Sequence, residues 1–293
     1  EWGLTYEELA ALNSRLIYAS LTAYGELGPE RDREGFDLVA YWARSGLMDL
    51  VRAPGADPAP AIPGMGDHPT AVSLYAAILT ALFKRQQTGE GSHVHTSLLA
   101  NGMWSASCIA QGVFAEADFT LYHQLSSHLF TRLLYEAADG RWLQFSMVRT
   151  DEEVDMLLTA IGRPDLLLDP RFVTADLRVE HGNVLVEEMK AALITETAAH
   201  WMQVLTDVGV PVALVGRVDE LTSDPQVIAN DMAITPTPEV GMPSVINHPL
   251  NIEGLATRPA GRAPDLGEHS EAILAELGYT ATDIARAKEQ GVI

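Results

Sequence analysis

The sequence predicts a layered α/β domain followed by a smaller domain of different character. Up to about residue 116, helical and strand patterns alternate along the chain, which is typical of a sheet covered by helices. Beyond about residue 120, a hairpin signal and several short amphipathic helices follow instead. The chain has 293 residues, of which 47% are hydrophobic and 20% charged. It is therefore long enough for one large domain or two ordinary ones, with a sizeable core.

The first part contains one long helix whose bounds are well marked. Pro69 stands near its first turn and Gly89 follows its end, as is usual for helix starts and stops. The strand that precedes it is mostly apolar, which indicates burial on both faces. In chain order we expect a helix at 4–13, a strand at 16–24, a helix at 36–48, a Pro/Gly-rich loop at 53–66, a helix from about Pro69 to Gln87, a strand at 92–98 and a helix at 98–116.

The second part opens with a hairpin. The segments 134–137 and 142–148 flank the turn Ala138-Asp139-Gly140-Arg141, and an Asp-Gly pair between apolar runs is a strong hairpin signal. After it we expect helices at 151–161, 178–195 and 197–208, a strand at 210–215, a loop-rich region at 235–264 and a helix at 268–289. The domain boundary is expected at 115–130.

Charge and cysteine content exclude some classes of partner. The formal net charge is −21, which argues against nucleic acid and anionic membrane, although a local basic pocket could still bind a phosphate-bearing ligand. Cys108 is the only cysteine, so no internal disulfide is possible and a reducing cytoplasm fits. Its apolar surroundings favour a buried side chain. No apolar run is long enough to span a membrane, and no signal peptide is visible. Because the chain starts at Glu1 already in helical register, we expect further residues upstream.

The segment Gly64-Met65-Gly66-Asp67-His68-Pro69-Thr70 is the main candidate site. Its two glycines allow a tight bend and the close approach of a ligand. A carboxylate at a helix N-terminus lies near free N–H groups and the positive end of the helix dipole, and those N–H groups can hold an oxyanion. An ionised aspartate there can attack a carbonyl carbon such as that of a thioester. The alternative, which the local pattern alone favours, is that Asp67 is an N-cap.

The same segment also carries a family resemblance. Gly66-Asp67, the helix through Tyr75–Leu82 and the run from Arg85 to Leu99 resemble the core signature of class III (CaiB/BaiF-type) coenzyme A transferases. Further segments resemble the rest of the family in the same order: Leu16–Ser20, Tyr24-Gly25 with Gly28-Pro29, Gly35–Asp37 with Ser45–Met48, Asp139–Trp142, Asp169–Phe172, Trp201 with Gly209–Pro211, Asp224–Gln226 and Ala263–Tyr279. Each match alone is weak, but the matches are collinear and cover essentially the whole chain.

The resemblance implies a fold and partners. Family members have a Rossmann-like large domain, a smaller α+β domain and a C-terminal segment that returns to the large domain, which suggests the segments 1–120, 121–255 and 256–293 here. They begin with about a hundred further residues, the size of a small domain, so the resemblance leads us to expect that the large domain is incomplete at its N-terminus in this chain. An interlinked homodimer is expected. The expected partners are an acyl-CoA and a small carboxylic acid, with CoA as a substrate and no tightly bound cofactor, nucleic acid or membrane.

The resemblance also implies a mechanism and a set of site residues. Asp67 would form a mixed anhydride with the acyl group and then an aspartyl-CoA thioester. Binding of substrate or CoA would involve the following residues: Phe36, Asp37, Gly66, His68 and Arg149. Arg149 could neutralise an acceptor carboxylate or be a surface residue. Asp37 could lie near Asp67 or cap a helix.

Two other functions stay open. The α-methylacyl-CoA racemases share the fold but need acid/base groups on both sides of the α-carbon. Where they have a histidine this chain has Phe36, which cannot move a proton, and where they have a glutamate it has Arg149. Both departures favour the transferase. The third possibility is a non-catalytic or partner-dependent chain.

A metal site is not expected. His93 and His95 would lie on one face of a strand, as metal ligands can. No third ligand stands at a natural spacing from them.

Overall fold

The computed structural model describes residues 3–121, 124, 129–255 and 259–293. The chain divides into two compact units, Glu1–Arg132 with Asp165–Met189, and Leu133–Pro164 with Lys190–Ile293. The three expected segments, 1–120, 121–255 and 256–293, stay a prediction.

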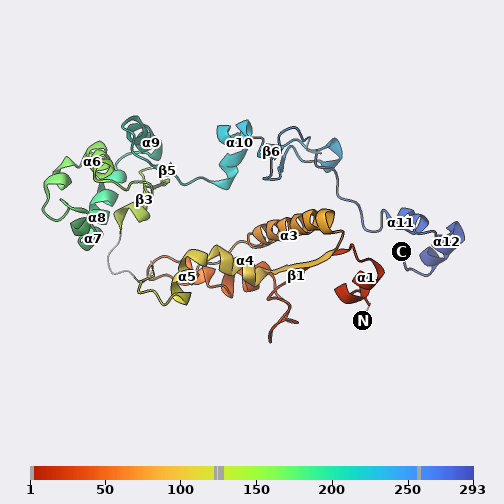
Figure 1. Cartoon of the computed structure of the whole chain (residues 1–293). Helices are drawn as coiled ribbons and strands as arrows, with labels where there is room; N and C mark the ends of the chain where they lie inside the picture. The colour runs from red at the N-terminus through yellow and green to blue at the C-terminus, as the bar shows by residue number, and fades with distance from the viewer. Residues whose placement is uncertain (1–2, 122–123, 125–128, 256–258) are drawn as a thin grey trace. The chain divides into compact units, whose positions relative to one another are not determined.

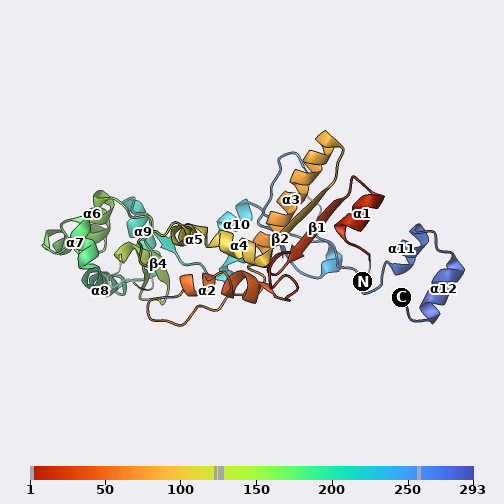
Figure 2. The same cartoon turned by 60° about the horizontal axis from the view of Figure 1, so that its bottom comes forward.

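A parallel strand pair organises the first unit. The strands β1 (Ile17–Thr22) and β2 (Ser92–Ser97) pair in parallel, with Ile17 opposite Ser92 and Thr22 opposite Ser97. Parallel strands need a long crossover, and the helix α3 (Asp67–Thr88) is part of it, lying alongside both strands in Figures 1 and 2. Both strands were predicted at these places.

Hydrogen bonds fix the direction of α3 against the strands. Near its C-terminus, Lys84 Nζ donates to Ser92 Oγ at 3.3 Å, where β2 begins. Near its N-terminus, Ser73 Oγ donates to Asn101 Oδ1 at 2.6 Å, just beyond the end of β2. The N-terminus of α3 therefore lies toward the carboxyl ends of the two strands, the edge at which open α/β sheets bind ligands.

The helix α3 confirms the expected helix and extends it by two residues at its start. Gly89 ends it in the left-handed conformation (φ 78°), and its N–H donates to Arg85 O at 2.9 Å. Ala81 is buried, and the helix packs against both strands. Another side carries exposed apolar residues at spacings of three and four: Val72, Tyr75, Leu79 and Phe83. The helix therefore has a second apolar side besides the one that faces the sheet.

Four of the expected helices are interrupted. Those at 178–195 and 268–289 break near His181 and near Gly278, and the other two lie in the first part of the chain. Residues 36–48 form a π-helix, η1 (Leu38–Ala43), and a short helix, α2 (Leu47–Leu50), separated at Gly46 with φ 86°. Residues 98–116 form α4 (Leu98–Ser105) and α5 (Ser107–Phe114), separated at Ala106. A buried cluster joins η1, α2 and α4; it consists of Ala40, Tyr41, Leu47, Leu98 and Ala106.

The second unit contains the expected hairpin. The strands β3 (Leu134–Glu136) and β4 (Trp142–Gln144) pair antiparallel, and β5 (Ala213–Leu214) adds to β4. Helices α6 (Asp151–Ala160) and α9 (Ala198–Asp207) were both predicted. Within this unit the indole N–H of the buried Trp201 donates to Leu193 O at 2.8 Å.

Of the remaining elements, α8 (Gly182–Leu193) is the longest, with 12 residues. The others are α1 (Tyr6–Leu12), η3 (Phe130–Arg132), η4 (Pro164–Leu168), α7 (Ala175–Glu180), η5 (Val218–Ser223), α10 (Pro225–Ala229), β6 (Ala233–Ile234), η6 (Pro238–Val240), β7 (Val245–Ile246), α11 (Ser270–Glu276) and α12 (Ala281–Glu289). In the described part of the chain, no helix has the length and apolar character needed to cross a membrane. The expected burial of Cys108 is wrong, because the residue is exposed on α5.

We predict that Gly91→Ala destabilises the protein. Gly91 N–H donates to Ser14 O at 2.8 Å, and a Cβ on Gly91 would lie 1.9 Å from Leu16 O, a backbone atom that cannot move without disturbing β1. We expect a loss at least as large as that of an overpacked core, about 1–3 kcal/mol, measured by urea unfolding. Gly216→Ala is the control, because its Cβ would meet no atom within 4 Å. Equal stability of both variants would contradict the close approach.

Candidate active site

Asp67 presents a carboxylate without a protein partner. It is the first residue of α3 and is exposed, and Gly66 occupies the N-cap position. The Asp67 side chain makes no hydrogen bond or ion pair with any of the described residues. The capping interpretation is therefore wrong. The carboxylate lies at the positive end of a 22-residue helix, where a negative charge is stabilised.

The backbone donors of the first turn are mostly occupied. His68 N–H donates to Gly64 O at 3.2 Å, and Thr70 N–H donates to Gly66 O at 3.4 Å. Pro69 has no N–H. Within the described part of the chain, this leaves the N–H of Asp67 itself without an acceptor. The expectation that several free N–H groups of this helix could hold an oxyanion is corrected accordingly.

Asp37 fastens the loop that precedes Asp67. Its side chain is buried, with 4% of the residue exposed. Its Oδ2 atom accepts two hydrogen bonds, from Gly64 N–H at 2.7 Å and from Gly66 N–H at 3.1 Å. Asp37 stands at the N-cap position of η1 but makes no capping bond, so the helix-capping alternative is wrong. The structure brings Asp37 next to the Gly64–Asp67 segment, as one of the two interpretations held.

Thr70, which belongs to the candidate segment, and Tyr41, which the sequence did not indicate, complete the surroundings of Gly66. Thr70 is fully buried, and its Oγ1 donates to Gly66 O at 2.7 Å. A Cβ on the buried Gly66 would lie 2.6 Å from Cγ of Tyr41. The spacing of four between Asp37 and Tyr41, and of three between Asp67 and Thr70, could have indicated a shared helix face.

The other expected site residues are placed differently. His68 follows Asp67 and is exposed. Phe36 is 84% exposed and borders a surface pocket of about 400 Å³ together with Arg31 and Arg33. Arg149 belongs to the other unit, where its N–H donates to Glu153 Oε2 at 2.7 Å. A role of Arg149 at Asp67 stays a prediction.

The two histidines of β2 lie beside an acid that the sequence reasoning missed. His93 Nε2 is 2.8 Å from Ser20 Oγ and 3.2 Å from Glu26 Oε1, and His95 Nδ1 is 3.9 Å from Glu26 Oε2. The hydrogen bond from Ser20 lowers the pKa of Glu26 below its ordinary value, and the nearby histidines lower it further, against an opposing effect of burial. Among the described residues, no group of three such side chains has the geometry to hold a metal ion.

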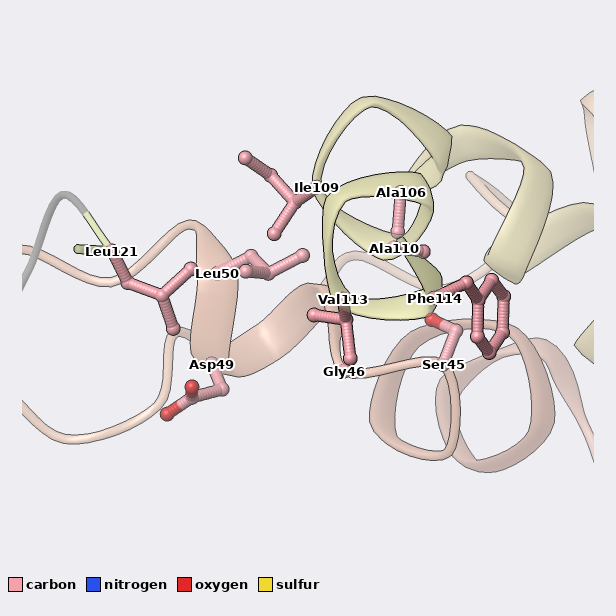
Figure 3. A pocket seen from close by; sticks show the side chains of 10 residues that line it. All are labelled: Ser45, Gly46, Asp49, Leu50, Ala106, Ile109, Ala110, Val113, Phe114 and Leu121. Carbon is pink, nitrogen blue, oxygen red and sulfur yellow. The ribbon is translucent and has the colours of Figure 1, made fainter. Parts of the chain in front are cut away.

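An apolar cavity lies apart from Asp67 in the same unit. Its volume is about 250 Å³. Figure 3 shows its lining residues on and around α2 and α5. Its polar residues have protein partners: Ser45 Oγ donates to Tyr41 O, and Asp49 pairs with Arg52 at 2.8 Å. The cavity is lined by Ser45, Gly46, Asp49, Leu50, Ala106, Ile109, Ala110, Val113, Phe114 and Leu121. No residue of the Gly64–Thr70 segment borders it, so it is not the candidate site.

The chain is similar to known CoA-transferases along its whole length. It is 29% identical to the (R)-2-hydroxy-4-methylpentanoate CoA-transferase of Clostridioides difficile, over 99% of this chain and 73% of the relative. It is 28% identical to the cinnamoyl-CoA:phenyllactate CoA-transferase of Clostridium sporogenes, over 96% of this chain and 69% of the relative.

Solved structures agree with these relatives. The crystal structure of a CaiB/BaiF family protein from Brucella suis superposes with a TM-score of 0.81 at 27% identity, covering 94% of this chain and 71% of that one. The expected mixed α/β fold is thereby confirmed, with small sheets and many helices. The profile of CoA-transferase family III matches residues 1–270, and the chain accordingly belongs to that family of enzymes.

Proposed function

We propose that this enzyme moves CoA between carboxylic acids with Asp67 as the covalent carrier. The observation that supports this best is the contrast at Asp67. Its carboxylate is exposed and unpaired among the described residues, whereas the residue before it is held through both its N–H and its C=O. A nucleophile needs an available lone pair and a fixed position relative to the carbonyl it attacks.

The proposed reaction proceeds by acyl exchange at Asp67. A carboxylate oxygen attacks the thioester carbonyl of the donor, the C–S bond breaks, and a mixed anhydride and the CoA thiolate result. The thiolate attacks the aspartyl carbonyl, which releases the donor acid and leaves an aspartyl-CoA thioester. The acceptor carboxylate then attacks this thioester, and the thiolate finally takes the acceptor acyl group from the new anhydride. The steps conserve protons and regenerate the Asp67 carboxylate.

Asp37 acts in this proposal as a positioning residue. One buried carboxylate oxygen accepts from two backbone N–H groups of the glycine segment, and hydrogen bonds to a charged acceptor are among the strong ones. The contact holds the backbone from which Asp67 projects. His68, Phe36 and Arg149 are proposed to contact the acyl-CoA or the acceptor acid, and the enzyme is proposed to be a homodimer without a tightly bound cofactor.

We predict an acyl-CoA-dependent adduct on Asp67. Both relatives named above carry a 2-hydroxy acid in their names, so the CoA esters of 2-hydroxy-4-methylpentanoate and phenyllactate are the first donors to use. Intact mass and trapping with hydroxylamine should detect the adduct, and Asp67→Asn should remove both the adduct and the transfer activity. Asp57→Asn, at an exposed acid of the preceding loop, should retain both. Transfer that survives in Asp67→Asn would sink the proposal.

We predict a graded effect of substitutions at Asp37. Asp37→Ala leaves the buried Gly66 N–H without its acceptor, which costs about 1–3 kcal/mol, and should lower kcat by up to about 100-fold through misplacement of Asp67. Asp37→Asn keeps an oxygen acceptor and should therefore lose less stability and less kcat than Asp37→Ala. Urea unfolding and steady-state kinetics measure the two effects. Equal losses in the two variants would contradict a role in holding the loop.

We predict no exchange of the α-proton. Phe36 stands where the resembling racemases have a histidine, and its ring carries no exchangeable proton. In deuterated buffer, NMR or mass spectrometry of a 2-methylacyl-CoA should show no deuterium at the α-carbon while CoA transfer proceeds. Deuterium entering at a rate comparable with turnover would favour the racemase instead.

A further inference from the structure

We propose that Tyr41 is a positioning residue of this active site, because its aromatic ring supports Gly66 and thereby sets the place of the Asp67 carboxylate. The inference rests on the function proposed above and extends it to a residue of the buried core. Tyr41 does not contact the reacting atoms in this proposal; it acts through the backbone of Gly66.

The contact between Gly66 and Tyr41 is tight enough to exclude any side chain at position 66. A Cβ there would lie 2.6 Å from Cγ of the tyrosine, and 2.8 Å from its Cβ and Cδ1 atoms. Gly66 has an ordinary helical backbone conformation, with φ −86° and ψ −28°. A glycine is therefore required here by the proximity of the ring and not by the backbone dihedral angles.

The tyrosine ring cannot easily withdraw from this contact. Tyr41 is 4% exposed, and its hydroxyl oxygen lies 2.5 Å from Ser105 Oγ at the end of α4. Its carbonyl oxygen accepts a hydrogen bond from Ser45 Oγ. A Cβ on Gly102 of α4 would lie 2.2 Å from that same carbonyl oxygen. Both ends of Tyr41 are thus fixed to neighbouring elements.

Three contacts together hold Gly66. Its N–H donates to Asp37, its carbonyl oxygen accepts from Thr70 Oγ1 at 2.7 Å, and its Cα rests on Tyr41. The peptide that leads into Asp67 consequently has little freedom to shift. A displacement of about 1 Å in a reacting group can cost on the order of 100-fold in rate, so losing the ring should affect chemistry more than substrate binding.

The ordinary alternative is that Tyr41 only fills the core. In that case its replacement would lower stability, and the coupling between Tyr41→Ala and Gly66→Ala would be seen in the free energy of unfolding but not in kcat. A double-mutant cycle measured on kcat separates the two cases, because only residues that act on each other show coupled effects.

The test compares Gly66→Ala in the wild-type and the Tyr41→Ala backgrounds of the intact protein. Tyr41→Ala removes Cγ and Cδ1, the two ring atoms nearest to position 66. It leaves only the Cβ atom of residue 41, and a small shift can accommodate that contact. We expect Gly66→Ala to lower kcat on the order of 100-fold alone, but by less than about 10-fold when the tyrosine has already been replaced. KM for the acyl-CoA should change less than about threefold throughout, and the rate of adduct formation at Asp67 should follow kcat.

Gly64→Ala is the matched control. Gly64 has φ 87° and no atom within 4 Å of a Cβ, so alanine there is strained by its backbone conformation alone. Its effect on kcat should be the same in the wild-type and the Tyr41→Ala backgrounds. The inference is wrong if Gly66→Ala, like Gly64→Ala, lowers kcat by the same factor with and without Tyr41→Ala. It is also wrong if KM rises as much as kcat falls.

A milder pair of variants covers the case in which Tyr41→Ala does not fold. Tyr41→Phe and Ser105→Ala remove the same hydrogen bond, and each should lower kcat severalfold without a further loss when combined. Tyr75→Phe, at an exposed tyrosine of α3, should leave kcat unchanged. The inference is overturned if Tyr41→Phe and Ser105→Ala are both fully active and the first cycle does not support it. That is the case if the effects of Gly66→Ala and Tyr41→Ala on kcat multiply, or if they cannot be measured because Tyr41→Ala does not fold. A wild-type protein without transfer activity or adduct would overturn the proposed function instead.

Discussion

The arrangement around Asp67 depends on one buried carboxylate oxygen. Asp37 Oδ2 accepts from the N–H groups of Gly64 and Gly66, which follow it by 27 and 29 residues. The intervening chain includes the Pro/Gly-rich loop at 53–66, which has no helix or strand of its own. Such a loop cannot by itself define where the next helix begins. The hydrogen bonds to Asp37 do so, because they join the loop to η1 immediately before α3.

Asp67 therefore needs no hydrogen bond of its own to be in place. In many buried sites the reactive group is oriented by partners that also lower its reactivity, since a hydrogen bond to a carboxylate uses a lone pair. Here the backbone of Gly64 and Gly66, held by Asp37, fixes the position of residue 67 instead. A second polar residue, Asn101, joins the neighbouring elements: its Nδ2 donates to Ser97 O at 2.9 Å and its Oδ1 accepts from Ser73 of α3. The start of α3 is thus tied to the carboxyl end of β2.

The sequence predicted the elements with strong periodicity or clear end signals. The strand pair, α3 and the β3–β4 hairpin were all found near their expected places, because Pro69, Gly89 and the Asp139-Gly140 turn mark them locally. The division of the expected helix at 36–48 was not predicted. Its apolar pattern fits an α-helix. The hydrogen bond from Arg44 N–H to Val39 O at 3.1 Å spans five residues, as in a π-helix, and no local sequence pattern indicates such a bond.

For the site, the sequence indicated which residues belong together but not how they interact. Asp67 and Asp37 were both identified, yet each was also compatible with a helix cap, and the caps are absent. Tyr41 was missed because a tyrosine on the apolar face of a helix looks like any other core residue in the sequence. Glu26 was missed because it lies far in sequence from His93 and His95. The parallel register places His95 opposite Ser20, and the chain after β1 returns so that Glu26 accepts a hydrogen bond from Ser20 Oγ.

The π-helical winding of η1 makes the length of this segment as important as its composition. Asp37 and Tyr41 reach the same glycine from one wide turn, in which N–H groups bond five residues back. Deleting one residue between Asp37 and Tyr41 would leave the carboxylate and the ring three positions apart, which in an α-helix places them about 60° apart around the helix axis. Either the carboxylate or the ring would then point elsewhere. Relatives that keep this arrangement should tolerate substitutions in η1 far better than insertions or deletions.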